Sequence, residues 1–204
     1  MSQRYNFIHN LINNPEVYKI IQFLMSGTSI EKKIIKKRIS KKKIKVLDIG
    51  CGPANVLNYL PKCEYYGYDI DKRSINYAKK KYSKKNFHFF CKKFNKNELK
   101  SLPNFDLILL FGIMHHLNDK QVNSILNLCK KKMKKNSHLL TKDPILIENQ
   151  NIIAKFLINN DRGLNVRNRK NYLRLIKKHF KNSQFKIIHQ SFVPYTWFTT
   201  TCKK

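Results

Sequence analysis

A short apolar run that ends in two glycines constrains this chain more than any other feature. Residues Ile44 to Ile49 are mostly apolar, which is typical of a buried strand, and Gly50 and Gly52 follow directly. Glycine has no Cβ, so the backbone of such a turn can approach a bound ligand closely. A helix is expected from about Ala54 to Leu60, because Pro61 cannot continue it. The stretch therefore predicts a strand, a ligand-binding turn and a helix.

Two acidic residues narrow the choice of ligand. Dinucleotide-binding turns have the pattern G-x-G-x-x-G, but Asn55 stands at the third glycine position. Asp48 lies at the strand end, where its charge would repel a diphosphate and suit the ammonium and sulfonium of S-adenosylmethionine. Asp69 ends the next predicted strand and can accept hydrogen bonds from both ribose hydroxyls, whereas Asp71 is better explained as a helix cap. The pattern favours S-adenosylmethionine over NAD.

The rest of the chain alternates between predicted strands and helices. Strands are expected at 44–49, 65–70, 87–91, 105–111 and 137–142, and helices stand between them. Later helices are expected near 151–159 and 170–180, and an edge hairpin at 185–192 and 197–202. We expect one α/β domain with a Rossmann-like doubly wound sheet, mostly parallel, and helices on both faces. Its parts would be a helical cap (1–43), a cofactor-binding core (44–145) and C-terminal helices with the hairpin (146–204).

Two stretches resemble a known enzyme family. Residues Val46 to Asp71 resemble the cofactor-binding half of the class I S-adenosylmethionine-dependent methyltransferases. Residues Phe105 to Leu117, which end in His-His-Leu, resemble the fourth-strand segment of the small-molecule branch. The flanks resemble one bacterial subgroup, through Tyr18 and Gln22, the D-R-G-x-x-V-R stretch at 161–167 and Pro-Tyr-Thr at 194–196. The resemblance implies methyl transfer from S-adenosyl-L-methionine, but no particular substrate.

The resemblance also implies which residues bind the cofactor. These are Asp48, Gly50, Cys51, Gly52, Asp69, Ile70, Phe111, Gly112 and Tyr18. One position departs from the family, whose members commonly have an acidic residue after the third strand that contacts the adenine amino group. Lys92 and Lys93 stand there, so we expect adenine to be recognised by backbone groups or by apolar packing against Phe94.

Candidate catalytic residues follow the fourth strand. His115 and His116 lie at the edge of the sheet where ligands bind in such folds, so either could be a general base. The alternative is that one of them packs or hydrogen-bonds to the backbone and orients the loop. Asp143, after the fifth strand, is a loop cap or a substrate contact.

Candidate substrate residues lie near the end of the chain. Arg162 or Arg167 could bind an anionic substrate that Asp161 orients, because guanidinium groups bind carboxylate and phosphate through two hydrogen bonds. The alternative is an internal ion pair that ties this segment to the sheet. Tyr195 could line the pocket or fill the edge of the core.

The net charge of +30 raises the question of a nucleic-acid partner. Most of the excess is lysine, and runs such as 79–81, 130–132 and 177–178 fall at predicted helix ends, where cations complement the helix dipole. We therefore favour a small-molecule methyltransferase. An RNA-directed methyltransferase and a catalytically degenerate cofactor-binding module remain as alternatives.

The cysteines indicate neither a metal nor a disulfide framework. There are five, and no pair has C-x-x-C spacing, so reduced thiols in the cytoplasm are expected. The apolar run Ile20 to Met25 is too short to span a membrane, so no membrane insertion is expected. The oligomeric state is not predicted.

Overall fold

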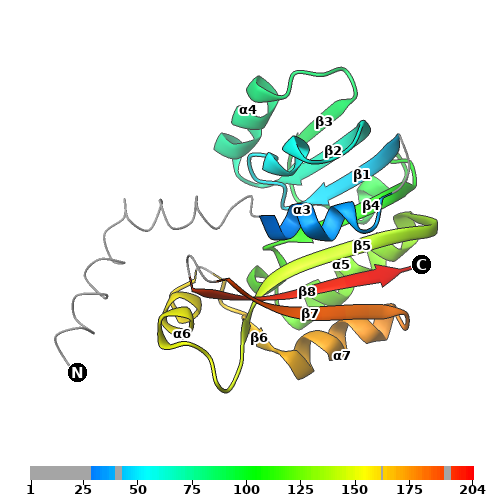
Figure 1. The fold of residues 1–204 in the computed structure, drawn as a ribbon. Coiled ribbons are helices and arrows are strands. Elements are labelled where there is room, and N and C mark those ends of the chain that lie inside the picture. Colours follow the sequence, from blue (N-terminus) through cyan, green and yellow to red (C-terminus); the bar gives the residue numbers. More distant parts are fainter. Residues whose placement is uncertain (1–28, 40–42, 162, 191–193) are drawn as a thin grey trace.

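A mixed sheet with helices on both faces forms the framework of the molecule (Figure 1). The computed structural model describes residues 29–39, 43–161, 163–190 and 194–204. The strands are β1 (Ile44–Ile49), β2 (Cys63–Asp69), β3 (Phe87–Cys91), β4 (Phe105–Phe111), β5 (Met133–Leu146), β6 (Arg167–Asn168), β7 (Ser183–Gln190) and β8 (Tyr195–Lys203). The helices are α3 (Ser29–Lys36), α4 (Lys72–Lys81), α5 (Asp119–Lys132), α6 (Ile152–Asn159) and α7 (Arg169–His179), with 3-10 turns η1 (Asn55–Asn58), η2 (Lys96–Leu99) and η3 (Met114–His116).

The strand order places β1 and β4 at the centre of the sheet. The order is β3-β2-β1-β4-β5-β8-β7, and β6 pairs with the far end of β5. Strands β1 to β5 are parallel, whereas β8 runs antiparallel to both β5 and β7. The chain leaves β1 toward β2 on one side and leaves β4 toward β5 on the other. This reversal opens a crevice at the carboxyl ends of β1 and β4.

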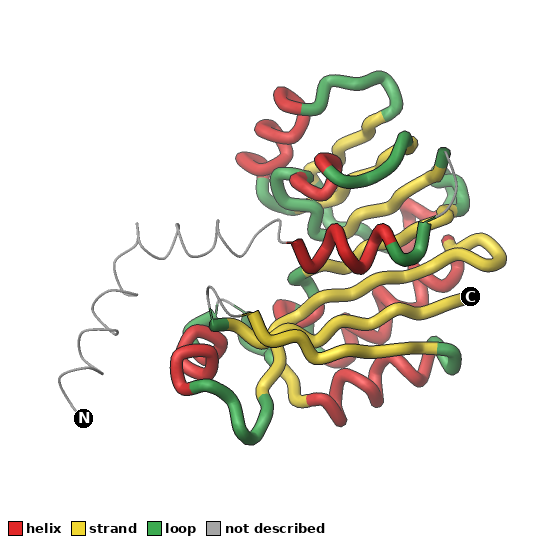
Figure 2. Tube along the Cα trace, in the orientation of Figure 1, coloured by secondary structure: helices red, strands yellow, loops and turns green. Residues whose placement is uncertain are grey.

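Alternating side chains of the central strands pack against different helices. Leu47 and Ile108 belong to the core that includes α5 and α7, whereas Val46 and Leu109 belong to the core that includes α3 and α4. Figure 1 shows α3 crossing one face of the sheet while α5 and α7 cover the other. The expected doubly wound α/β sheet is therefore confirmed, with β7 and β8 as the antiparallel edge (Figure 2).

Strand β5 is longer than the sequence indicates. It begins at Met133, whereas the sequence predicted a start at residue 137, because the polar residues Lys134 to Asn136 are not typical of a buried strand. It also continues through Pro144. The pairing of β5 with β4 ends at Lys142, two residues earlier. The missing N–H of Pro144 therefore interrupts no pairing with β4.

The helix expected from Ala54 to Leu60 is a 3-10 turn, η1. Ala54 has a left-handed conformation with φ of 56°, which an α-helix does not allow, so the regular hydrogen-bonding pattern cannot begin there. The connection from β1 to β2, residues 50–62, therefore contains a 3-10 turn in place of an α-helix. Of the expected helical cap (1–43), residues 1–28 and 40–42 lie outside the described residues.

The helix caps agree with the sequence. The side chain of Asp71 accepts from the backbone N–H groups of Arg73 and Ser74, and Asn118 forms a capping box with Gln121. The lysine runs at 79–81 and 130–132 fall in the last turns of α4 and α5, as expected. Because these helices run back against the parallel strands, their basic ends lie at the amino edge of the sheet, away from the crevice.

Two further observations concern the cysteines and the helices. All five cysteines are free thiols. Within the described ranges no helix has the length and apolar content that crossing a membrane requires.

Candidate functional site

A cavity of about 920 Å³ lies at the carboxyl edge of the sheet. It opens at the crevice between β1 and β4, where the strand order reverses. Its lining includes the glycine turn after β1, the ends of β2 and β4, and the segment around Asp161. The volume falls in the range of small-molecule sites, which are commonly about 300–1,000 Å³.

The glycine turn forms one wall of this cavity. Gly50 and Gly52 have φ of 77° and 51°, a left-handed conformation that favours glycine. A Cβ on Gly50 would lie 2.7 Å from Cδ1 of Ile113, so packing also requires glycine there. A Cβ on Gly52 would meet nothing within 4 Å, so its backbone faces open space. Both glycines therefore occupy the positions that the sequence predicts.

Asp69 joins the glycine turn to the end of β2. Its carboxylate accepts hydrogen bonds from the N–H of Gly52 at 2.7 Å and from the N–H of Asp71 at 2.8 Å. Each carboxylate oxygen has a second lone pair, and the side chain lines the cavity, so the group can still accept hydrogen bonds from a ligand.

Asp48 is placed differently from the expectation. Its side chain is buried, accepts a hydrogen bond from the hydroxyl of Tyr65 at 2.6 Å, and is absent from the described lining of the cavity. Burial raises the pKa of Asp48 to about 7, and the charges of Glu31 and Asp69 act in the same direction, against the lowering effect of Tyr65. The carboxylate can therefore act on a ligand through its electric field rather than by contact.

The other expected cofactor residues divide into two groups. Ile70, Phe111 and Gly112 line the cavity, and the side chain of Ile70 is 77% exposed, so it offers apolar surface to a ligand there. Cys51 is buried outside the described lining, and burial raises the pKa of its thiol, so it remains protonated. Tyr18 lies outside the described residues.

The segment after β3 forms the far wall, where the family commonly has an acidic residue. Lys92, Lys93 and Phe94 all line the cavity. Lys92 forms an ion pair with Glu98 at 2.9 Å, and Phe94 packs in the core with its ring at an edge of Tyr68. Apolar packing by Phe94 thus remains available for an adenine ring.

His115 lies between two carboxylates at the opposite end of the cavity. Its Nδ1 is 2.8 Å from Oδ1 of Asp143, and its Nε2 is 3.3 Å from Oδ1 of Asp161. Burial lowers the pKa of His115, but the hydrogen bonds to Asp143 and Asp161 and their charges outweigh it and raise the pKa to about 9. A histidine that is protonated at neutral pH does not serve as a general base, so of the two expected candidates only His116 remains for that role.

His116 and Asp161 complete this end of the cavity. Both line it, and the side chain of His116 is exposed, with its ring 4.1 Å from that of His115. Asp161 accepts hydrogen bonds from the N–H of Gly163 at 2.8 Å and from the hydroxyl of Tyr195 at 2.9 Å. A Cβ on Gly163 would lie 2.0 Å from Cδ2 of His115, so this turn packs directly on the imidazole. Tyr195 is buried and acts by holding Asp161.

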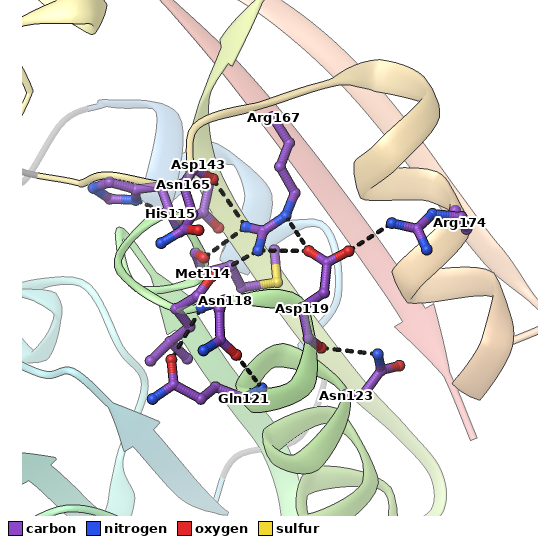
Figure 3. Close-up of polar contacts among 11 residues, drawn as sticks. Met114, His115, Asn118, Asp119, Gln121, Asn123, Asp143, Asn165, Arg167 and Arg174 are labelled. Carbon is purple, nitrogen blue, oxygen red and sulfur yellow. Dashed lines mark hydrogen bonds and ion pairs between the residues drawn. The ribbon is translucent and has the colours of Figure 1, made fainter.

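Arg167 occupies an internal position rather than the cavity wall (Figure 3). Its guanidinium pairs with Asp119 at 2.9 Å and donates to the backbone carbonyls of Met114, Leu117 and Asn165. All of its nitrogens are engaged, so the alternative of an internal ion pair describes Arg167 better than substrate binding. Arg162 lies outside the described residues.

A third polar group in the cavity, the ammonium of Lys142, was not predicted from the sequence. The Lys142 ammonium is buried, forms a short ion pair with Glu31, and lies 4.3 Å from the centre of the Trp197 ring. All three side chains line the cavity. Lys142 and Asp143 are consecutive where β5 passes the end of β4. Two charged residues soon after an apolar run were the available signal in the sequence. The partner Glu31 is 111 residues away, so the pair cannot be read from local sequence.

Comparisons with known proteins agree with this geometry. The profile of a family described as a methyltransferase domain matches residues 40–192. No curated protein sequence matches the chain.

Solved structures share the fold at low sequence identity. Human N-acetylserotonin methyltransferase in complex with SAM is 19% identical with a TM-score of 0.63, and the match covers 90% of this chain but only 55% of the human protein. The plantazolicin methyltransferase BamL, in complex with a triazolic desmethylPZN analog and SAH, is 16% identical with a TM-score of 0.65 over 96% of this chain and 94% of BamL. A SAM-dependent methyltransferase from Archaeoglobus fulgidus is 18% identical with a TM-score of 0.64, and the match covers 91% of this chain and 99% of that protein.

Replacing Arg167 by alanine tests its structural position. We expect Arg167→Ala to lower the free energy of unfolding by about 3 kcal/mol, because it leaves the carbonyls of the buried loop without their donor and removes one of the two guanidinium partners of Asp119. Arg174→Ala is the matched control, since Arg174 also pairs with Asp119 but its side chain is 62% exposed; it should cost less than about 1 kcal/mol. Urea denaturation measures both, and an Arg167→Ala protein as stable as the parent would contradict the assignment.

The pKa of Asp48 predicts a pH dependence of stability. Because folding raises this pKa from 3.8 to about 7, the stabilisation from proton uptake is complete below pH 4 and is lost as the pH rises to 7. Asp48→Asn has no proton to lose there. Between pH 4 and 8 the free energy of unfolding of the parent should therefore fall, relative to that of the variant, by up to about 4 kcal/mol. Denaturation of the ligand-free parent and variant across this pH range measures the effect. If the free energies of unfolding of the two proteins changed in parallel with pH, the buried position of Asp48 would be refuted.

Proposed function

The chain belongs to the methyltransferase domain family, and from this premise we propose that it transfers a methyl group from S-adenosylmethionine to a small molecule. The observation that carries the proposal is the continuity of the cavity. The glycine turn and Asp69 line one end, and His115, His116 and Lys142 line the other. A cofactor at the first end would thus share one continuous cavity with an acceptor at the second.

The residues at the first end suit S-adenosylmethionine. The open space over Gly52 admits a ligand against the backbone, and Asp69 can accept from ribose hydroxyls. Ile70 offers an exposed apolar side chain beside it, and Phe94 lies farther along the wall. When bound, the cofactor supplies a methyl group that is already activated by a sulfonium.

The charge of the lining also favours a cationic ligand. Glu31, Asp69, Asp71 and Asp161 line the cavity, although the whole chain has only 12 acidic residues. Of its 42 lysines and arginines, the described lining includes Lys92, Lys93 and Lys142. With His115 protonated, the acids and cations of this lining nearly balance, whereas the chain as a whole has a net charge of +30. A cationic ligand therefore meets less repulsion in the cavity than over the rest of the surface.

The protein's contribution to methyl transfer would be mainly alignment. The reaction is an in-line displacement, so holding the acceptor atom opposite the sulfonium can supply several kcal/mol of barrier lowering. His115, held by Asp143 and Asp161, fixes the loop after β4, while His116 is the base for an acceptor that must lose a proton.

The acceptor end is shaped for a small molecule. The apolar part of the wall at this end is formed by Phe111, Pro144 and Trp197, and Lys142 adds an ammonium group. An anionic group on the acceptor would meet Lys142, but this lysine already pairs with Glu31. Arg167 pairs with Asp119 and so does not provide a second cation for such a group. The proposal therefore rests on the small size of the acceptor more than on a negative charge.

The basic charge gives less support to an RNA substrate. The lysine runs of α4 and α5 lie at the amino edge of the sheet, whereas the cavity lies at the carboxyl edge. An RNA held by those lysines would not present a base to the cavity.

Binding of S-adenosylhomocysteine tests the proposed cofactor site. Calorimetry should show binding of this product but not of NAD. Asp69→Ala should weaken it by at least about 1 kcal/mol, or roughly fivefold, because a charge-assisted hydrogen bond is lost. Glu64→Ala, an acid on the same strand but away from the cavity, should leave the affinity unchanged. Binding of NAD alone would refute the proposal, and equal affinity in both variants would remove Asp69 from the site.

A further inference from the structure

We propose that His115, His116 and Asp161 bind a divalent transition-metal ion at the acceptor end of the cavity. The described residues bring one potential ligand atom of each side chain within 4.8 Å of the others. Two imidazoles and a carboxylate form a donor set that suits ions such as Co²⁺, Zn²⁺ or Fe²⁺ rather than Mg²⁺ or Ca²⁺. The site lies where two loops meet, after β4 and after α6.

The distance between two of the ligand atoms fits a bound ion. Nε2 of His115 and Oδ1 of Asp161 are 3.3 Å apart. Two ligands that each lie about 2.0–2.2 Å from one ion, at a tetrahedral or octahedral angle, are roughly 3–3.5 Å apart. The potential ligand atom of His116 lies within 4.8 Å of the other two, so binding an ion would require it to move closer to them.

Other groups hold these ligands in the required orientation. Asp143 contacts Nδ1 of His115, which leaves Nε2 as the atom that faces Asp161 and the cavity. Asp161 is held in turn by the hydroxyl of Tyr195. Histidine ligands of metals commonly donate their other ring N–H to a carboxylate in this way.

The charges of the site balance a divalent ion. Asp143 is fully buried, and its Oδ2 has no hydrogen-bond partner among the described residues. Asp143 and Asp161 together contribute two negative charges beside two imidazoles. A divalent ion at this position would compensate for both negative charges.

The role of the ion rests on the proposed function. Three protein ligands leave coordination positions open toward the cavity, where an acceptor oxygen could bind. With an ion bound, His116 would be a ligand, and the ion would take over its role of activating the acceptor by lowering the pKa of the bound oxygen. The site would then select acceptors with a hydroxyl or carboxylate oxygen beside the methylated atom.

Titration of the full-length protein with Co²⁺ tests the site without any reaction. We expect one equivalent to bind, with visible absorption bands of protein-bound Co²⁺. A Cys91→Ser background removes the exposed thiol as a competing ligand. His116→Gln should weaken binding at least about tenfold and change the spectrum. His189→Gln, an equally exposed histidine on β7, is the matched control and should bind as the parent does.

The outcomes separate the metal site from the cofactor site. Asp161→Asn should also lose the Co²⁺ spectrum, while His116→Gln should still bind S-adenosylhomocysteine. Absence of bound Co²⁺, or the same spectrum and affinity in the parent and in His116→Gln, would overturn the metal site. Loss of S-adenosylhomocysteine binding in the parent protein would instead overturn the proposed function and leave the metal site intact.

Discussion

The pairing of β1 with β4 determines where this protein can bind a ligand. Both strands end at the same edge of the sheet, but the chain continues from them in opposite directions, so no connection covers the space above their ends. The glycine turn enters that space from one side, and the His115 loop from the other. Asp69 keeps the turn in place by accepting from the N–H of Gly52. The cavity is thus a consequence of topology, and the residues at the strand ends give it its chemistry.

Electrostatics connects the two ends of this cavity. In a strongly basic chain, the buried acids Asp48, Asp143 and Glu31 are costly to keep charged unless a cation lies nearby. Lys142 pairs with Glu31, and His115 lies between Asp143 and Asp161, whereas Asp48 has only the hydroxyl of Tyr65. A sulfonium cofactor would add positive charge on the side of Asp48, and a metal ion would add it beside Asp143, whose Oδ2 has no hydrogen-bond partner among the described residues.

Local sequence predicted the parts of the site that lie within one turn. The strands around Gly50 and Asp69 and the cap at Asp71 were predictable because they depend on hydrophobic runs, glycines and capping residues close in sequence. The contacts of Arg167 with Asp119 and of Lys142 with Glu31 were not, because they join residues 48 and 111 positions apart. The burial of Asp48 under Tyr65 likewise follows from the register of β1 and β2, which the sequence leaves undetermined.

A crystal structure with S-adenosylhomocysteine tests the central claim most directly, because that claim concerns where one ligand lies. The ribose hydroxyls should lie within hydrogen-bonding distance of Asp69, with the adenine between Ile70 and Phe94. The sulfur should face the end of the cavity formed by His116 and Lys142. A ligand bound outside this cavity, or a sulfur directed away from those two side chains, would contradict the account.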